Sequence, residues 1–230
     1  MMGCPVCNSE QFDSYGGRQQ ARCMSCGALE RGRLSWIVLE KLDLLRPGVR
    51  MLNMAPEPFM LFHGAKAIGN SYRAADYDPD LFSKWKLPVA KLDLCEDLIG
   101  MAPSSLDVIM HNHVLEHIPC DVSAVLANLN RLLVPGGVHL FSVPILPGRF
   151  SEEDLNPILT PEERRRRFGQ GDHLRIFGDG DFMSFIERAM PLDKLVDLSL
   201  LITEEELETA ALSPDVFKSL NGNRVFAWRK

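Results

Sequence analysis

The sequence lacks the features of a membrane-embedded or exported protein. No apolar run among its 230 residues approaches the roughly 18 residues that a membrane-spanning helix needs. No signal-peptide pattern is visible either, because cysteines follow almost directly on the first residue. We therefore expect a cytoplasmic protein with no membrane partner.

Basic charge is also scarce. The chain has 25 Lys and Arg against 31 Asp and Glu, which gives a formal net charge of -6. Nucleic-acid binders usually present a basic face, so this balance argues against such a partner without excluding a local basic patch. The chain shows no internal repeat or low-complexity segment. Its length and its 46% hydrophobic content suit one domain with a small appendage.

Glycine is missing from residues 51–60, MLNMAPEPFM, which instead contain Pro56 and Pro58. The stretch ends the first predicted strand of an alternating strand–helix pattern. A cofactor-binding turn at this place is usually rich in glycine. Either a nucleotide-type site is built in an unusual way here, or such a site has been lost.

Cysteines are present in a definite pattern at the N-terminus. Two Cys-x-x-Cys pairs, Cys4 with Cys7 and Cys23 with Cys26, are joined by residues that include the hairpin-forming Gly16 and Gly17. This spacing predicts one structural Zn²⁺ held by four thiolates. Unligated thiols or disulfides are the alternatives, and a reducing compartment disfavours disulfides. We expect Cys95 and Cys120 to be ordinary buried thiols.

Strands and helices alternate along the rest of the chain. The predicted strands are 49–54, 71–77, 88–94, 106–112, 138–144, 193–202 and 224–230. The predicted helices begin near residues 30, 121 and 179, and Asp121 can cap the second of them. This alternation predicts an α/β fold: a Rossmann-like, doubly wound, seven-stranded and mostly parallel sheet. Ligands bind such sheets at the carboxyl ends of the strands.

The chain divides into two predicted parts. Residues 1–32 form a zinc-ribbon-like module, and residues 33–230 form the α/β domain. A long connection at about 145–177 breaks the alternation, and a segment of that length is often a functional lid. It carries an arginine run, 164–167, which is either a solvated helix face or a contact for an anionic substrate or partner.

Residues 106–144 carry the most specific motif of the sequence. A strand ends in Asn-x-Val-Leu-Glu-His (112–117), and the next helix ends in Arg-Leu-Leu-Val-Pro-Gly-Gly (131–137). Here the chain resembles the class I S-adenosylmethionine-dependent methyltransferases, in particular their small-molecule branch. The resemblance covers roughly residues 49–144 and is weaker towards the C-terminus.

The resemblance implies a set of residues that bind S-adenosylmethionine. Asp76, with Asp78 as a second candidate, would hydrogen-bond the ribose, and Asp93 would meet the adenine amino group beside Leu94. Each aspartate taken alone is equally well explained as a turn or helix cap. The full expected cofactor set is Asn53, Ala55, Pro56, Glu57, Asp76, Tyr77, Asp93, Leu94, Asn112 and His113.

The loop after the first strand departs from the family pattern, which is an acidic residue followed by Gly-x-Gly. Ala55 is the smallest replacement that still allows close approach of a ligand. Pro58 suits the first position of the next helix, whose N-terminus favours a carboxylate. Glu57 is then free to meet the amino group or sulfonium of the cofactor. Methyltransferase-like proteins with an Ala-Pro-Glu loop and an N-terminal cysteine module are similar, including a stretch like GDHLRIFG (171–178).

Histidine is the natural base near neutral pH. We expect His113 and His173 to act in catalysis, and His117, His173 and Arg175 to bind substrate. A structural role is the alternative for each histidine. A second metal site at these histidines lacks acidic partners at clear ligand spacing.

Four functions follow from these observations. The first is methyl transfer from S-adenosylmethionine to a small-molecule acceptor. The others are methylation of rRNA or tRNA gripped by the zinc module, cyclisation or aminocarboxypropyl transfer with the same cofactor, and a scaffold with a vestigial pocket. The sequence leaves homodimer formation open.

Overall fold

The structure, a computed structural model, describes residues 2–230. Its centre is a six-stranded sheet in the order β11-β7-β6-β3-β4-β5. The strands are β3 (Met51–Met54), β4 (Tyr72–Asp76), β5 (Val89–Lys91), β6 (Leu106–Asn112), β7 (Leu133–Ser142) and β11 (Phe226–Arg229). All neighbours are parallel except β11, which runs antiparallel to β7. The predicted Rossmann-like, mostly parallel sheet is confirmed.

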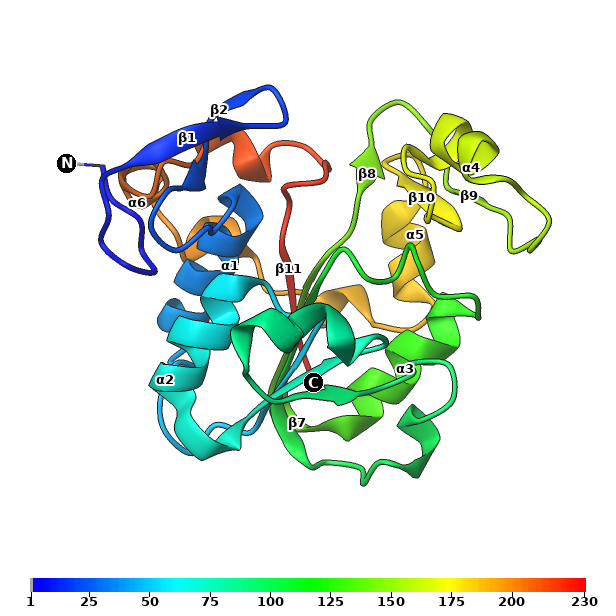
Figure 1. Cartoon of the computed structure of the whole chain (residues 1–230), viewed down its shortest axis with the longest axis horizontal. Coiled ribbons are helices and arrows are strands. Elements are labelled where there is room, and N and C mark those ends of the chain that lie inside the picture. The colour runs from blue at the N-terminus through cyan, green and yellow to red at the C-terminus, as the bar shows by residue number, and fades with distance from the viewer. Residues whose placement is uncertain (1) are drawn as a thin grey trace.

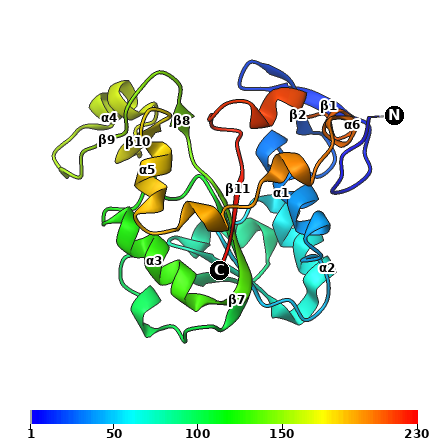
Figure 2. The same ribbon diagram turned by 180° about the vertical axis from the view of Figure 1, so that it is seen from behind.

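Helices cover both faces of the sheet (Figures 1 and 2). The helices α1 (Glu30–Lys41) and α2 (Ala65–Ile68) lie on one face. The helices α3 (Val122–Leu132), with Asp121 as the predicted cap, and α5 (Phe182–Glu187) lie on the other. Successive strand residues point to opposite faces, so Met51 joins the core under α1 while Leu52 joins the core under α3. Strands buried on both sides explain the apolar runs in the sequence.

The sheet has six strands where the sequence predicted seven. Residues 193–202 form two short 3₁₀ turns, η5 (Leu192–Lys194) and η6 (Leu198–Leu200), instead of a strand. Asp197 caps the second turn by accepting a hydrogen bond from the Ser199 amide, which turns the chain away from an extended path. A single bridge between Leu195 and Trp228 is the only pairing that this segment makes with β11 among the described residues.

The N-terminal module is a hairpin of β1 (Phe12–Tyr15) and β2 (Arg18–Cys23), with Gly16 and Gly17 at positive φ in its turn. Its buried residues belong to the same core as α1 and α6 (Glu204–Thr209). The fully buried Arg33 guanidinium donates to carbonyl oxygens of the hairpin, of Ala28 and of residues 210–211. The hairpin is therefore packed into the main domain and has no separate core.

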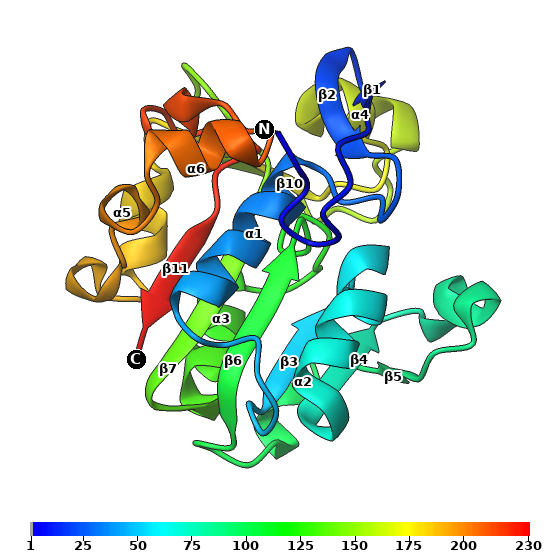
Figure 3. The ribbon, with the colours of Figure 1, turned by 90° about the vertical axis from the view of Figure 1, so that its left-hand side faces the viewer.

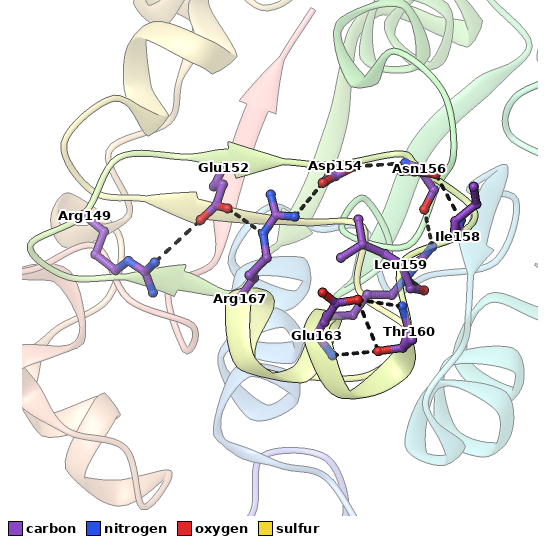
Figure 4. A network of polar contacts seen from close by, with 10 residues as sticks. Arg149, Glu152, Asp154, Asn156, Ile158, Leu159, Thr160, Glu163 and Arg167 are labelled. Atoms are coloured by element: carbon purple, nitrogen blue, oxygen red, sulfur yellow. Dashed lines mark hydrogen bonds and ion pairs between the residues drawn. The ribbon is translucent and has the colours of Figure 1, made fainter.

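The connection after β7 has secondary structure of its own. It contains β8 (Ile145–Leu146), β9 (Glu152–Glu153), α4 (Pro161–Phe168) and β10 (Arg175–Gly178), with the strands in the order β8-β10-β9. Arg167 of the arginine run lies between Glu152 and Asp154, at 2.8 and 2.5 Å (Figure 4). Arg167 therefore links α4 to β9 and the residues after it, and so stabilises this segment.

The hairpin and the 145–178 segment both stand at the end of the sheet towards which β6 points (Figure 3). That end is the carboxyl end of the parallel strands. Cys95 and Cys120, expected as free thiols, form a disulfide between the loops that follow β5 and β6. None of the described helices has the length and apolar character that a membrane crossing requires.

Candidate cofactor and acceptor site

A cavity of about 540 Å³ opens at the carboxyl ends of β3, β4, β5 and β6. This size suits a nucleotide-type ligand. Its wall consists of Met54, Ala55, Ala75, Asp76, Tyr77, Leu81, Leu92, Asp93, Leu94, Cys95, His113, Val114, His117, Ile118 and Pro119. The structure thus brings together, in one wall, most of the residues that the resemblance assigned to the cofactor.

Ala55 forms the turn after β3 with φ of 46°, in the left-handed region where glycine is favoured. Its amide donates to the Ala75 carbonyl at 2.9 Å, which holds the turn against β4. Helical structure begins at Pro58, as predicted, and the Met60 amide donates to the Glu57 carbonyl. The loop therefore keeps the shape of a glycine turn although it contains no glycine.

Asp76 and Asp93 reach the cavity wall from the ends of β4 and β5. The Asp76 carboxylate accepts a hydrogen bond from the Asp78 amide at 2.8 Å, and burial raises its pKa. Asp93 accepts from the Cys95 amide at 2.9 Å. Each carboxylate is held in place by its own turn and still has oxygen lone pairs for a ligand hydroxyl or amino group.

Glu57 differs from expectation, because its carboxylate is engaged on both sides. Oε1 accepts from Nη2 of Arg31 at 2.8 Å, and Oε2 accepts from the Asn112 side-chain amide at 3.3 Å. Arg31, at the start of α1, was not anticipated from the sequence. Its Nε is buried without a partner, and its charge helps to lower the pKa of His113 in the cavity wall. Arg31 is thus a cation beside Glu57 that still has a donor without a partner.

Asn53 and Pro56 do not line the cavity. The Asn53 amide is 2% exposed, donates to the Met110 carbonyl and accepts from the Tyr72 hydroxyl. It holds β3 to its neighbours β4 and β6, so the structure gives it a role inside the sheet. Asn112 likewise lies behind the wall, where it positions Glu57.

His113 stands at the end of β6 with φ of 54°, a strained conformation for this residue type. Its Nε2 is 3.0 Å from the Gly222 carbonyl, and its Nδ1 is 3.4 Å from Glu116 Oε1. Burial lowers the pKa of His113 to about 4, so the ring is neutral at pH 7. His113 lines the cavity, and contacts at both ring nitrogens fix the orientation of its ring.

Glu116, His117 and His173 gather beside His113. Glu116 is fully buried, and burial raises the pKa of its carboxyl to about 8. His117 lines the cavity, whereas His173 is 2% exposed and lies behind His117 with ring centroids 4.8 Å apart. We expected His173 to act in catalysis and to bind substrate. It does not line the cavity.

Arg175 also differs from the expected role in substrate binding. It is 2% exposed, and its guanidinium donates to the carbonyls of Leu115, Ile118 and Cys120 and to Glu153. These bonds hold the loop after β6 against β10. Four of the five guanidinium donors are engaged in these bonds and the residue is buried, so Arg175 does not present itself to a substrate anion.

The predicted zinc ligands Cys4, Cys7, Cys23 and Cys26 converge, with one sulfur from each within 4.8 Å of the others. The Sγ atoms of Cys4 and Cys26, and those of Cys7 and Cys23, are 3.6 Å apart. This spacing fits four sulfurs around one tetrahedral ion at about 2.3 Å. The donor set suits Zn²⁺ and, being closed, leaves no position for a substrate.

A family model described as a methyltransferase domain matches residues 39–189. The chain belongs to this methyltransferase family. The match runs from the end of α1 through α5, and so includes every strand of the central sheet except β11 and the whole cavity wall. No curated protein sequence matches the chain significantly.

Solved structures of other proteins are similar to this methyltransferase-family chain. An S-adenosylmethionine-dependent methyltransferase from Mesorhizobium loti is 13% identical, with a TM-score of 0.52 over 87% of this chain and 100% of that one. An S-adenosylmethionine-dependent methyltransferase from Archaeoglobus fulgidus is 17% identical, with a TM-score of 0.47 over 87% and 94%. The cyclase SpnF is 16% identical, with a TM-score of 0.46 over 86% and 80%. At 13% identity the likeness to the Mesorhizobium loti structure shows a methyltransferase fold and does not show a substrate.

Proposed function

We propose that the protein catalyses methyl transfer from S-adenosylmethionine to a small-molecule acceptor. The single observation that carries the proposal is the cavity in which Ala55, Asp76 and Asp93 meet at the carboxyl ends of β3, β4 and β5. When bound, the cofactor supplies a methyl group already activated on a sulfonium. The protein then has to bind, orient and exclude water.

The residues present fit this cofactor. Asp76 would accept from the ribose hydroxyls and Asp93 from the adenine amino group, with Leu94 against the ring. The unpartnered Nε of Arg31 would donate to the carboxylate of the methionine part. Glu57 holds Arg31 for that role, so the Ala-Pro-Glu loop acts through the arginine instead of through the cofactor's amino group.

A small acceptor fits the part of the cavity next to His113 and His117. The His113 ring is neutral at pH 7, and both rings lie beside apolar Val114 and Ile118 in the same wall. The described surface of this cavity presents acidic and apolar groups and no cluster of Lys or Arg, which argues against a phosphate-rich acceptor such as RNA.

Calorimetric titration with S-adenosylmethionine and S-adenosylhomocysteine tests the cofactor site. Asp76→Ala should weaken binding about 10- to 100-fold, because it removes hydrogen bonds to a charged acceptor worth about 1.5–3 kcal/mol. Asp80→Ala is the matched control, since Asp80 is exposed and outside the cavity wall, and it should leave affinity unchanged.

Three outcomes separate the proposal from its alternatives. Equal loss in both variants would mean that charge in the region matters and that Asp76 is not a specific ligand. Absence of binding by zinc-loaded, folded protein would leave the scaffold function. Binding followed by a cyclised or aminocarboxypropylated product, detected by mass spectrometry, would replace methyl transfer by the other chemistry.

A further inference from the structure

The side chains of Glu116, His117 and His173 form a cluster whose chemistry is not used by the cofactor site. One potential ligand atom from each lies within 4.8 Å of the others. Glu116 comes from the loop after β6, and His173 comes from the segment before β10, far away in the sequence. The Leu174 amide donates to the Glu116 carbonyl at 2.8 Å and so holds the two segments together.

A hydrogen bond on the outer side of His173, and an ion-pair contact on the outer side of His117, indicate where the proton of each ring lies. Nδ1 of His173 is 2.9 Å from the Phe168 carbonyl, which can only accept, so Nδ1 carries the proton. Its Nε2 therefore presents a lone pair, and this atom is buried without a partner. His117 repeats the arrangement, with Nδ1 3.4 Å from Asp172 Oδ2 and Nε2 3.9 Å from Glu116 Oε1.

Glu116 completes a set of acceptors without a donor. It is fully buried, and neither of its carboxylate oxygens has a hydrogen-bond partner. Nδ1 of His113, 3.4 Å from Oε1, is also a lone pair, because Nε2 of that ring faces the Gly222 carbonyl. A proton on Glu116 would satisfy one of these contacts and leave the Nε2 atoms of both remaining rings unpartnered. A cation among them satisfies the carboxylate and both nitrogens together.

We propose that Glu116, His117 and His173 bind a divalent transition-metal ion next to the cavity. Two imidazole nitrogens and a carboxylate are a ligand set suited to Zn²⁺ and Fe²⁺. The hard ions Mg²⁺ and Ca²⁺ prefer oxygen ligands throughout. Ligand atoms around an ion with bonds of about 2.0–2.2 Å lie roughly 3–3.6 Å apart, so the 3.9 Å between His117 and Glu116 needs only a small adjustment.

Two further features agree with a metal site. Ligating histidines usually donate their other ring N–H to a backbone carbonyl or a carboxylate, which are the roles of Phe168 and Asp172 here. His117 also lines the cavity, so the site faces the space where an acceptor would lie. An oxygen or nitrogen atom of that acceptor is a fitting additional ligand.

Cobalt titration of the full-length protein tests the site. The cysteines are first loaded with Zn²⁺, after which Co²⁺ is added and followed by visible absorption. The proposal expects one further cobalt ion per chain, with ligand-field bands and no thiolate charge-transfer band, because the second set contains only nitrogen and oxygen ligands. Total metal content by mass spectrometry gives an independent count.

Variants then assign the ion to these residues. Glu116→Gln and His173→Asn should each abolish the additional cobalt ion. Asp172→Asn should weaken its binding about 10- to 100-fold by replacing the charged outer partner of His117 with a neutral one. His63→Asn is the matched control, because His63 lies on η1 (Met60–Gly64), packed against Trp36 and outside the cluster.

Either of two results would overturn the proposed metal site. A wild-type protein that takes up no cobalt beyond the cysteine site, or a Glu116→Gln variant that keeps the additional ion, refutes it. Asp172 is 69% exposed, so the Asp172→Asn variant should fold even if the buried substitutions do not. Unchanged cobalt affinity in that folded variant also contradicts the proposed role of Nε2 of His117.

Discussion

The pair His111 and His139 makes a sharp prediction about stability and pH. Both rings are fully buried, and their Nε2 atoms are 2.9 Å apart. His139 Nδ1 donates to the Asn130 side chain at 3.1 Å, so His139 Nε2 accepts the proton that His111 offers. Burial lowers the pKa of His111 to about 3 and that of His139 well below its ordinary value. The folded protein therefore keeps both rings neutral.

The sign and size of the effect follow from linkage. An unfolded histidine takes up a proton below about pH 6.5, while these folded ones do not until the pH is far lower, so stability falls as the pH falls below about 6.5. Each pH unit costs about 1.4 kcal/mol per histidine, which gives about 2 kcal/mol each at about pH 5 and about 4 kcal/mol for the pair. Above about pH 6.5 the contribution is fully present.

Urea unfolding at about pH 7 and about pH 5 measures this loss. The double variant His111→Leu with His139→Asn keeps a donor to Asn130 but cannot titrate. The loss of stability between the two pH values should be smaller in this variant than in the wild type by about 4 kcal/mol. The single variant His63→Asn is the control for replacing a histidine outside the pair, since His63 lies on η1.

The difference between the wild type and the double variant removes the contribution of other titrating groups to the pH dependence of stability, including the cysteine cluster, because both proteins contain those groups. If the double variant loses as much stability on acidification as the wild type, then the two rings are not held neutral in the fold. The reasoning from burial and tautomers would then be refuted.

Two further predictions concern the cofactor site. Ala55→Gly should change the free energy of unfolding by less than about 1 kcal/mol and retain S-adenosylhomocysteine binding. Ala55→Val should lower the free energy of unfolding by about 2 kcal/mol, because a β-branched residue is strained at positive φ. Urea unfolding measures the stability and calorimetry the binding, and equal stability of the two variants would contradict the left-handed turn. Arg31→Met should weaken S-adenosylmethionine binding about 10- to 100-fold but leave methylthioadenosine, which lacks the carboxylate, unaffected. Equal weakening of both ligands in a calorimetric titration would show that Arg31 acts on the loop and not on the carboxylate.

Much of the fold could be predicted from the sequence because local patterns determine it. The strand 106–112 and the helix after Asp121 lie where their apolar spacing and cap predicted them. The closing strand near residue 226 is also confirmed. The prediction of a strand at residues 193–202 was wrong, because a short run of alternating apolar residues does not distinguish a strand from successive 3₁₀ turns. The side-chain cap at Asp197 decided the outcome, and nothing in the pattern marks it as stronger than strand pairing.

The residues of the candidate site could likewise be predicted only in part. Residues at strand ends, such as Asp76 and Asp93, could be placed because the carboxyl ends of parallel strands meet at one edge. The burial of His173 and Arg175 could not be predicted, because it depends on how the 145–178 segment folds back onto the loop after β6. Glu116 was visible within a motif, yet its two orphan oxygens are a property of three-dimensional packing.

Arg31 and the Cys95–Cys120 disulfide were missed for a related reason. Arg31 reaches Glu57 across a sequence separation of 26 residues, and the two cysteines are 25 residues apart. Neither pair has a local spacing signal. One signal was available for Arg31, since it stands in the first turn of an amphipathic helix that must pack on the sheet next to the Ala-Pro-Glu loop.

The Arg33 contacts also bear on the order in which the chain folds. Its side chain joins the N-terminal hairpin to Ala210 across a sequence separation of 177 residues. Contacts between residues so distant in the chain close late and slow folding. During synthesis the hairpin leaves the ribosome long before the carbonyls of residues 210–211 that complete its packing. The buried guanidinium therefore remains short of acceptors until residue 211 has been translated.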